Sequence, residues 1–120
     1  MARLERKRFD NPDDTRPFQD KGQVKIVNIG EGVVGLATFE PGWRWSDHIK
    51  PIAGTDSCQA AHVGYVLSGR QIVRMDDGTE LEVGPGDVVS IPAGHDAWTV
   101  GDEPCVVIDF AGMGTYAKSG

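Results

Sequence analysis

The sequence has few of the features on which several large protein classes depend. It lacks an apolar run of the ~18 residues that a membrane helix needs, and no apolar segment of the kind found in secretory signals follows its charged N-terminus. Basic residues are outnumbered: 12 lysines and arginines stand against 18 aspartates and glutamates, which gives a formal charge of −6. Such a surface repels phosphates. We therefore expect a cytoplasmic protein that binds neither membrane nor nucleic acid.

Sustained helical periodicity is also missing. The 120 residues include 16 glycines and 7 prolines. No stretch of about a dozen residues free of both repeats its apolar side chains every 3.6 positions. The length suits one domain. The composition therefore predicts an all-β domain with many turns and little helix.

Cysteine is scarce, with only Cys58 and Cys105 present. One disulfide would be arithmetically allowed, but cytoplasmic thiols are kept reduced, so we expect free thiols or a metal ligand. Cys58 shares a strand face with His62 but lacks the flanking residues of a cysteine hydrolase, and the serines lack a glycine elbow. Nucleophilic catalysis therefore has little support from the sequence.

The chain does contain many short apolar runs separated by glycine and proline. Strands are predicted for residues 23–29, 33–40, 43–48, 58–68, 72–75, 79–83, 88–91, 95–99 and 105–110. Asp77-Gly78 suits a tight hairpin turn, and Gly84-Pro85-Gly86 forces another turn. Residues 49–57 show no clear period and predict a loop at the mouth of a barrel.

The N-terminal residues differ from the rest in composition. Residues 1–22 are polar, charged and interrupted by Pro12 and Pro17, and we interpret them as an N-terminal arm. Their basic cluster is short and terminal, so a solvated arm is a better explanation than a binding tail. Residues 23–120 form the predicted domain.

Two spacings in the central part resemble a known family. Gly86, five residues, Pro92, one residue and Gly94 resemble the second motif of the cupins. His62, six residues and Gly69 resemble the end of their first motif. The resemblance implies a jelly-roll β-barrel, the cupin double-stranded β-helix, and a homodimer paired through a sheet face or an exchanged arm. Cupins include metal-dependent oxygenases, isomerases and ligand-sensing domains, so the fold alone does not select a reaction.

The histidines of the chain lie in or beside these motifs, with departures from the usual pattern. The first cupin motif usually reads Gly, five residues, His-x-His and then Glu. Gly42 leads to His48 in this register, but Lys50 stands at the second histidine position. Counting back from His62 instead places Cys58 at that position.

We expect His48, His62 and His95 to share a divalent transition metal, namely Zn, Fe, Mn or Ni, with Cys58 as a fourth ligand. Imidazole is a common ligand of these metals, and a thiolate favours Zn over hard cations. In the alternative reading, His62 is a core histidine bonded to a backbone carbonyl and His95 caps the preceding turn.

The predicted ligand is a small molecule inside the barrel. Its pocket is predicted to be lined by Trp43, Trp45, Cys58, Tyr65 and Trp98. The sequence does not decide whether the protein is an enzyme. A non-catalytic ligand-binding or sensing barrel without metal is the alternative, and a barrel filled by its own side chains, serving as an interaction module, is the third.

Overall fold

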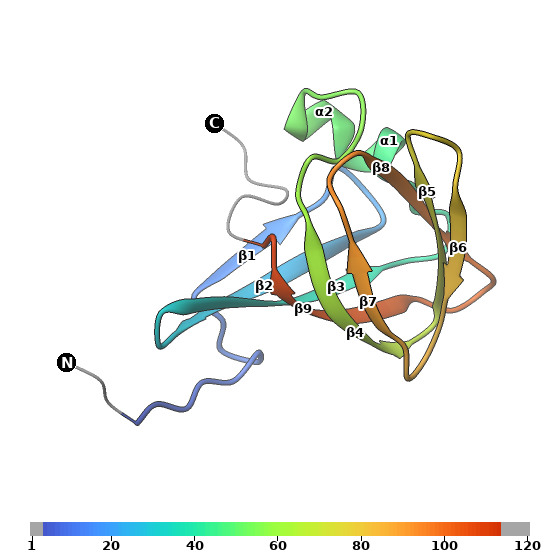
Figure 1. The fold of residues 1–120 in the computed structure, drawn as a ribbon. Helices are drawn as coiled ribbons and strands as arrows, with labels where there is room; N and C mark the ends of the chain where they lie inside the picture. The colour runs from blue at the N-terminus through green and yellow to red at the C-terminus, as the bar shows by residue number, and fades with distance from the viewer. Residues whose placement is uncertain (1–3, 114–120) are drawn as a thin grey trace.

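The computed structural model describes residues 4–113 of the chain. Within this range, two β-sheets face each other and two short helices lie at one end of them (Figure 1). The larger sheet has the strand order β1-β2-β3-β9-β4-β7 and the smaller one the order β6-β5-β8. The all-β jelly-roll architecture predicted from the sequence is confirmed, although the two sheets do not join into one closed barrel.

The strands follow the predicted apolar runs closely. They are β1 (Asp14–Pro17), β2 (Gly22–Ile29), β3 (Gly32–Phe39), β4 (His62–Ser68), β5 (Arg70–Met75), β6 (Glu80–Val83), β7 (Val88–Ile91), β8 (His95–Val100) and β9 (Cys105–Ala111). All strand pairs are antiparallel. Because successive side chains of a strand point to opposite faces, each run of alternating residues buries one face between the sheets.

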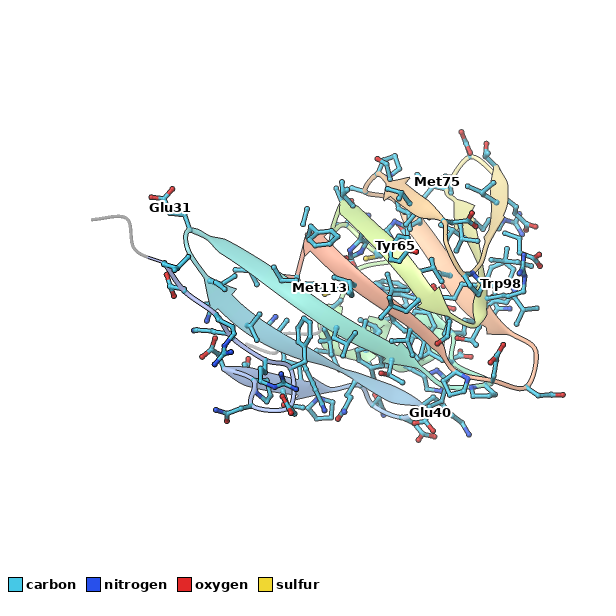
Figure 2. All side chains as sticks on the ribbon, turned by 90° about the horizontal axis from the view of Figure 1, so that it is seen from below. Glu31, Glu40, Tyr65, Met75, Trp98 and Met113 are labelled. Atoms are coloured by element: carbon cyan, nitrogen blue, oxygen red, sulfur yellow. The ribbon has the colours of Figure 1, made fainter. Side chains whose placement is uncertain are left out.

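β4 illustrates this alternation. His62, Gly64 and Val66 are buried, whereas the residues between them are exposed. Tyr65, labelled in Figure 2, belongs to the exposed set. The inward face of β4 is therefore the one that the sequence predicts.

The core contains an aromatic group at one end of the sheets. The ring centroids of Phe39 and Trp43 lie 4.4 Å apart, and Phe18 stacks on Phe39 at 5.5 Å. Phe18 precedes β2 and comes from the predicted arm. Aromatic pairs at these distances add stabilisation beyond the area they bury.

Part of the predicted arm joins the larger sheet. β1 pairs with β2, and the guanidinium of Arg16 donates a hydrogen bond to the carbonyl of Met113 at 2.7 Å. The β2–β3 hairpin extends away from the two-sheet body, with Glu31 near its tip (Figure 2). Residues 1–3 of the arm lie outside the described residues.

The strand predicted at residues 43–48 is wrong from Trp45 onward, where the chain forms α1 (Trp45–His48). The loop predicted at residues 49–57 contains a second short helix, α2 (Lys50–Ala53). The backbone N–H of Ser46, in the first turn of α1, donates to Asp96 Oδ1 at 3.1 Å. A helix start exposes N–H groups without backbone partners, so this carboxylate from β8 stabilises it. Neither helix has the length or apolar character needed to cross a membrane as a helix, and the same holds throughout residues 4–113.

Candidate metal centre

Three side chains with metal-binding atoms meet between the two sheets. They are Cys58, His62 and His95, all buried, and one donor atom from each lies within 4.8 Å of the others. Cys58 Sγ is 3.7 Å from His62 Nε2. The two imidazole rings are 5.4 Å apart and nearly perpendicular, at 70°. Residues far apart in the sequence thus share one interior site.

Backbone pairing fixes the positions of these residues. The N–H of Cys58 donates to the carbonyl of His95 at 2.7 Å, and the N–H of Gly94 donates to the carbonyl of Cys58 at 2.7 Å. Gly94 has a φ of +93°, a conformation that favours glycine and that turns the chain into β8. His62 begins β4 opposite Ile91 of β7. The site therefore lies where two strands begin and a loop pairs with one of them.

Each histidine uses its Nδ1 atom in a hydrogen bond away from the cluster. His62 Nδ1–H donates to Asp109 Oδ2 at 2.6 Å, and His95 Nδ1–H donates to the carbonyl of Pro92 at 2.8 Å. In a neutral imidazole that donates through Nδ1, the lone pair is on Nε2. Metal-binding histidines almost always have such a partner on their second nitrogen. Both rings are therefore oriented as ligands.

The electrostatics couple the thiol to His62. Burial raises the pKa of Cys58, but hydrogen bonds with His62 and His95 outweigh it and lower that pKa to about 6. Burial lowers the pKa of His62, but hydrogen bonds with Asp109 and Cys58 outweigh it and raise that pKa to about 9. Near neutral pH the metal-free pair is therefore a thiolate and an imidazolium. In contrast, burial raises the pKa of Cys105 to about 12, so that thiol stays protonated.

A cavity of about 50 Å³ opens beside the two histidines. Its walls include Trp43 and Trp45, as the sequence predicts, together with apolar side chains from both sheets. Gln71 on β5 and Asp109 on β9 add polar groups to this wall. The arrangement provides a mostly apolar space in contact with two of the candidate ligands, His62 and His95.

The structure brings together some of the predicted site residues and separates others. His48 lies at the end of α1, outside the cluster, and its Nδ1 accepts a hydrogen bond from the N–H of Arg44 at 3.0 Å. Trp98 packs under the guanidinium of Arg44, with 4.3 Å between Cζ and the ring centroid. Of the residues predicted to line the pocket, Cys58, Tyr65 and Trp98 are not among the cavity walls in the described part of the chain. Of the four ligands predicted from the sequence, the cluster contains Cys58, His62 and His95 and leaves out His48.

Two polar residues of the site, Asp109 and Gln71, were not predicted from the sequence. Asp109 interrupts the apolar run of β9, and it is only 3% exposed. An acidic residue within an apolar strand is a signal that could have identified it, because buried carboxylates are almost always paired. Gln71 offers no comparable signal, since a glutamine beside a glycine turn is common on exposed strands.

Comparison with known proteins identifies the architecture. The sequence family described as "Cupin domain" matches residues 54–111. A comparison with curated proteins found no match.

Several solved structures share the fold. A protein of unknown function from Rhizobium leguminosarum is 19% identical with a TM-score of 0.64, over 92% of this chain and 97% of that one. The polyketide cyclase RemF from Streptomyces resistomycificus is 20% identical with a TM-score of 0.64, over 91% and 79% of the two chains. A sugar phosphate isomerase from a cupin superfamily, from Silicibacter pomeroyi, is 17% identical with a TM-score of 0.63, over 88% and 73%. At these identities the likeness shows the fold alone. Together with the family match, it shows that this chain carries a small cupin domain.

Proposed function

We propose that this protein holds a divalent transition-metal ion at Cys58, His62 and His95 and binds a small molecule in the adjoining cavity. The observation that carries the proposal is the orientation of the two imidazoles. Both use Nδ1 as a donor to a fixed oxygen, and the Nε2 atom of His62 is 3.7 Å from the thiol sulfur. Histidines that served only the core would not need to converge with a cysteine.

The donor set suits particular metals. One thiolate and two imidazoles favour Zn first and Fe or Ni next, whereas Mn prefers oxygen ligands. Three protein ligands are typical of catalytic zinc sites, which leave a coordination position open for water or substrate. A metal bound there polarises a substrate oxygen or lowers the pKa of a bound water towards ~7.

The residues of the chain would perform the remaining tasks. Asp109 orients His62 and increases the basicity of its Nε2, and the carbonyl of Pro92 orients His95. Trp43 and Trp45 exclude water from the cavity, since both are at least 98% buried. These roles apply to an enzyme and to a metal-dependent binding protein alike. The cyclase and the isomerase among the similar structures perform different reactions, so neither reaction is adopted for this chain.

Metal content tests the proposal. We expect about one metal ion per chain in protein purified without added metal, measured by elemental analysis. His62→Ala should lose this metal, and His48→Ala is the matched control because His48 lies outside the cluster. In cobalt-substituted protein, Cys58→Ser should abolish the thiolate-to-cobalt absorption. Folded wild-type protein that binds no metal, or equal metal loss in both histidine variants, would contradict the proposal.

A second candidate function follows from the hydrogen bonds that connect Asp109 to His62 and His62 to Cys58. A thiolate beside an imidazolium that is held by a carboxylate is the arrangement of a nucleophilic cysteine. This candidate predicts rapid, stoichiometric alkylation of Cys58 by iodoacetamide at pH 7 and no need for metal in any turnover. Cys58 is only 3% exposed, which limits the access of a substrate to its sulfur. Nucleophilic catalysis is therefore the weaker candidate function.

Other expectations from the sequence remain predictions. A sensing barrel without metal predicts stabilisation by a ligand without its consumption, which ligand-dependent melting and product analysis would detect. The homodimer, the cytoplasmic location and the boundary between residues 1–22 and 23–120 also remain predictions.

A further inference from the structure

Three N–H groups on the cavity wall have no acceptor within residues 4–113. They are the indole Nε1 of Trp43, the indole Nε1 of Trp45 and the amide Nε2 of Gln71. Their residues are only 2%, 1% and 6% exposed. Native proteins pair the great majority of their buried polar atoms. Three unpaired donors around one cavity therefore indicate a ligand that accepts hydrogen bonds.

The Asp109 carboxylate and the Pro92 carbonyl near the cavity already accept hydrogen bonds. Asp109 accepts from His62 through Oδ2 and from the N–H of Ala111 through Oδ1, at 2.6 and 2.8 Å. The carbonyl of Pro92 accepts from His95. A ligand that brought its own N–H or O–H groups would have to share these oxygens with the bonds that they already accept. The free hydrogen-bonding capacity of the wall is thus mainly that of donors.

We infer that the cavity binds a small carboxylate with an apolar body; the inference rests on the proposed function for the ion beside it. A carboxylate has two acceptor oxygens, about four lone-pair sites and no donor, which suits three unpaired donors on residues of one cavity wall. The two positive charges of a divalent ion would balance the Cys58 thiolate and the Asp109 carboxylate, so the loaded site would not repel an anion. An alcohol or a primary amide has a single acceptor oxygen and brings donors of its own, so it would satisfy fewer of these N–H groups.

The cavities also define the shape of the ligand. The inner cavity of about 50 Å³ has room for about four water-sized groups. A second hollow of about 140 Å³ lies between β5, β6 and β7 and shares three walls with it, Val83, Val89 and Ile91. The carboxylate and its nearest carbons fit the inner cavity, and we place the apolar body on the side of the second hollow, which these three side chains adjoin.

The test compares matched ligands on zinc-loaded protein. By titration calorimetry, hexanoate should bind at least tenfold more tightly than hexanamide or hexan-1-ol, and more tightly than acetate. Gln71→Met keeps the length of the side chain and removes its N–H donors, and it should weaken hexanoate binding about tenfold without changing zinc stoichiometry. Gln19→Met, on an exposed residue away from the cavity, should leave the affinity unchanged.

A second variant protects the test against misfolding. Gln71→Glu keeps the shape and adds a negative charge, so hexanoate binding should fall further than in Gln71→Met while the circular dichroism spectrum stays that of the wild type. Zinc binding with equal affinities for hexanoate and hexanamide, or an unaltered hexanoate affinity in both Gln71 variants, would overturn the inference and leave the proposed metal site standing. If no zinc binds, hexanoate binding that depends on Gln71 would still support the carboxylate site, and only the proposed metal function would fail.

Discussion

Asp109 determines which nitrogen of His62 faces Cys58. Its Oδ2 accepts the Nδ1 proton at 2.6 Å, so Nε2 is left with the lone pair that a metal needs. The carboxylate also stabilises positive charge that develops on the imidazole when a cation binds. Asparagine at this position keeps the shape and loses the charge.

Asp109→Asn should therefore weaken metal affinity by about 10- to 100-fold, the usual effect of removing such a partner. Stoichiometry at saturating metal should stay that of the wild type, because the three ligands are retained. Competition with a chelating dye measures the affinity. Asp47→Asn, on an exposed residue of α1, is the control. Equal affinities for Asp109→Asn and the control would show that Asp109 does not support the site.

Proton release gives an independent test of the coupled pair. Metal binding needs both a thiolate and a neutral Nε2. With a pKa of about 6 for Cys58 and about 9 for His62, the metal-free pair holds one proton between these values. Metal binding then releases one proton from the pair between pH 6 and pH 9, two below this window and none above it.

Metal affinity should therefore rise about tenfold per pH unit between pH 6 and pH 9 and level off above pH 9, as far as this pair contributes. Calorimetry at pH 7.5 in buffers with different ionisation enthalpies counts the protons directly. Cys58→Ser removes the thiol of low pKa. The number of protons that this variant releases on metal binding should therefore differ from the wild-type number. An affinity that is constant across the window would contradict the coupling.

At the scale of elements, Gly69 connects the two sheets. It joins β4 of the larger sheet to β5 of the smaller one with a φ of +73°. A Cβ added there would lie 2.2 Å from the carbonyl oxygen of Pro104 and 2.5 Å from Cys105 Cα. These are backbone atoms of the adjacent connection, so a side chain cannot be accommodated by rotating a neighbour. The crossing between sheets requires glycine.

Gly69→Ala should lower the free energy of unfolding by about 2 kcal/mol or more, from left-handed strain plus the clash. Gly78→Ala is a matched control: Gly78 also has a positive φ, +93°, but an added Cβ would meet nothing within 4 Å. Urea denaturation followed by circular dichroism measures both. The control should lose only about 1 kcal/mol, the cost of the left-handed backbone. Equal losses would show that the approach of Pro104 is unimportant.

The strands could be predicted from the sequence because their signals are local. Alternating side chains and the Asp77-Gly78 turn lie within a few residues of the strands they define, and β5 and β6 pair across that turn as expected. Helix α1 could not be predicted in this way. Its first turn is stabilised by Asp96, which lies in β8, so the deciding contact exists only after folding.

The site was predictable in part, for a related reason. The cupin-like spacings predicted His62 and His95 as ligands. Counting back from His62 along the first motif placed Cys58 at a ligand position. The choice between Cys58 and His48 depends on which of them pairs with His95 through the backbone, and Cys58 does so. That pairing joins residues far apart in the sequence and forms only on folding, so spacing rules do not contain it.

At the scale of the whole molecule, the outer face of the larger sheet is unusually apolar. Val63, Tyr65 and Leu67 of β4 are 45%, 39% and 45% exposed. Tyr65 lies beside Val88 of β7, which is 76% exposed, and Phe110 of β9 is 57% exposed. Contiguous exposed apolar residues of this kind are rare on monomers. We therefore expect this face to be the contact surface of the homodimer that the cupin resemblance implies.

Charged residues introduced on this face should dissociate the predicted dimer, whereas charged residues introduced elsewhere should not. Tyr65→Lys combined with Val88→Lys should convert it to monomer, because a second copy would have to bury two uncompensated ammonium groups. Leu81→Lys changes an equally exposed residue, at 63%, on β6 of the other sheet and should leave the dimer intact. Size-exclusion chromatography with light scattering measures all three proteins at the same concentration. Wild-type protein that is monomeric at tens of micromolar, or dissociation caused by Leu81→Lys alone, would show that this face does not pair two copies.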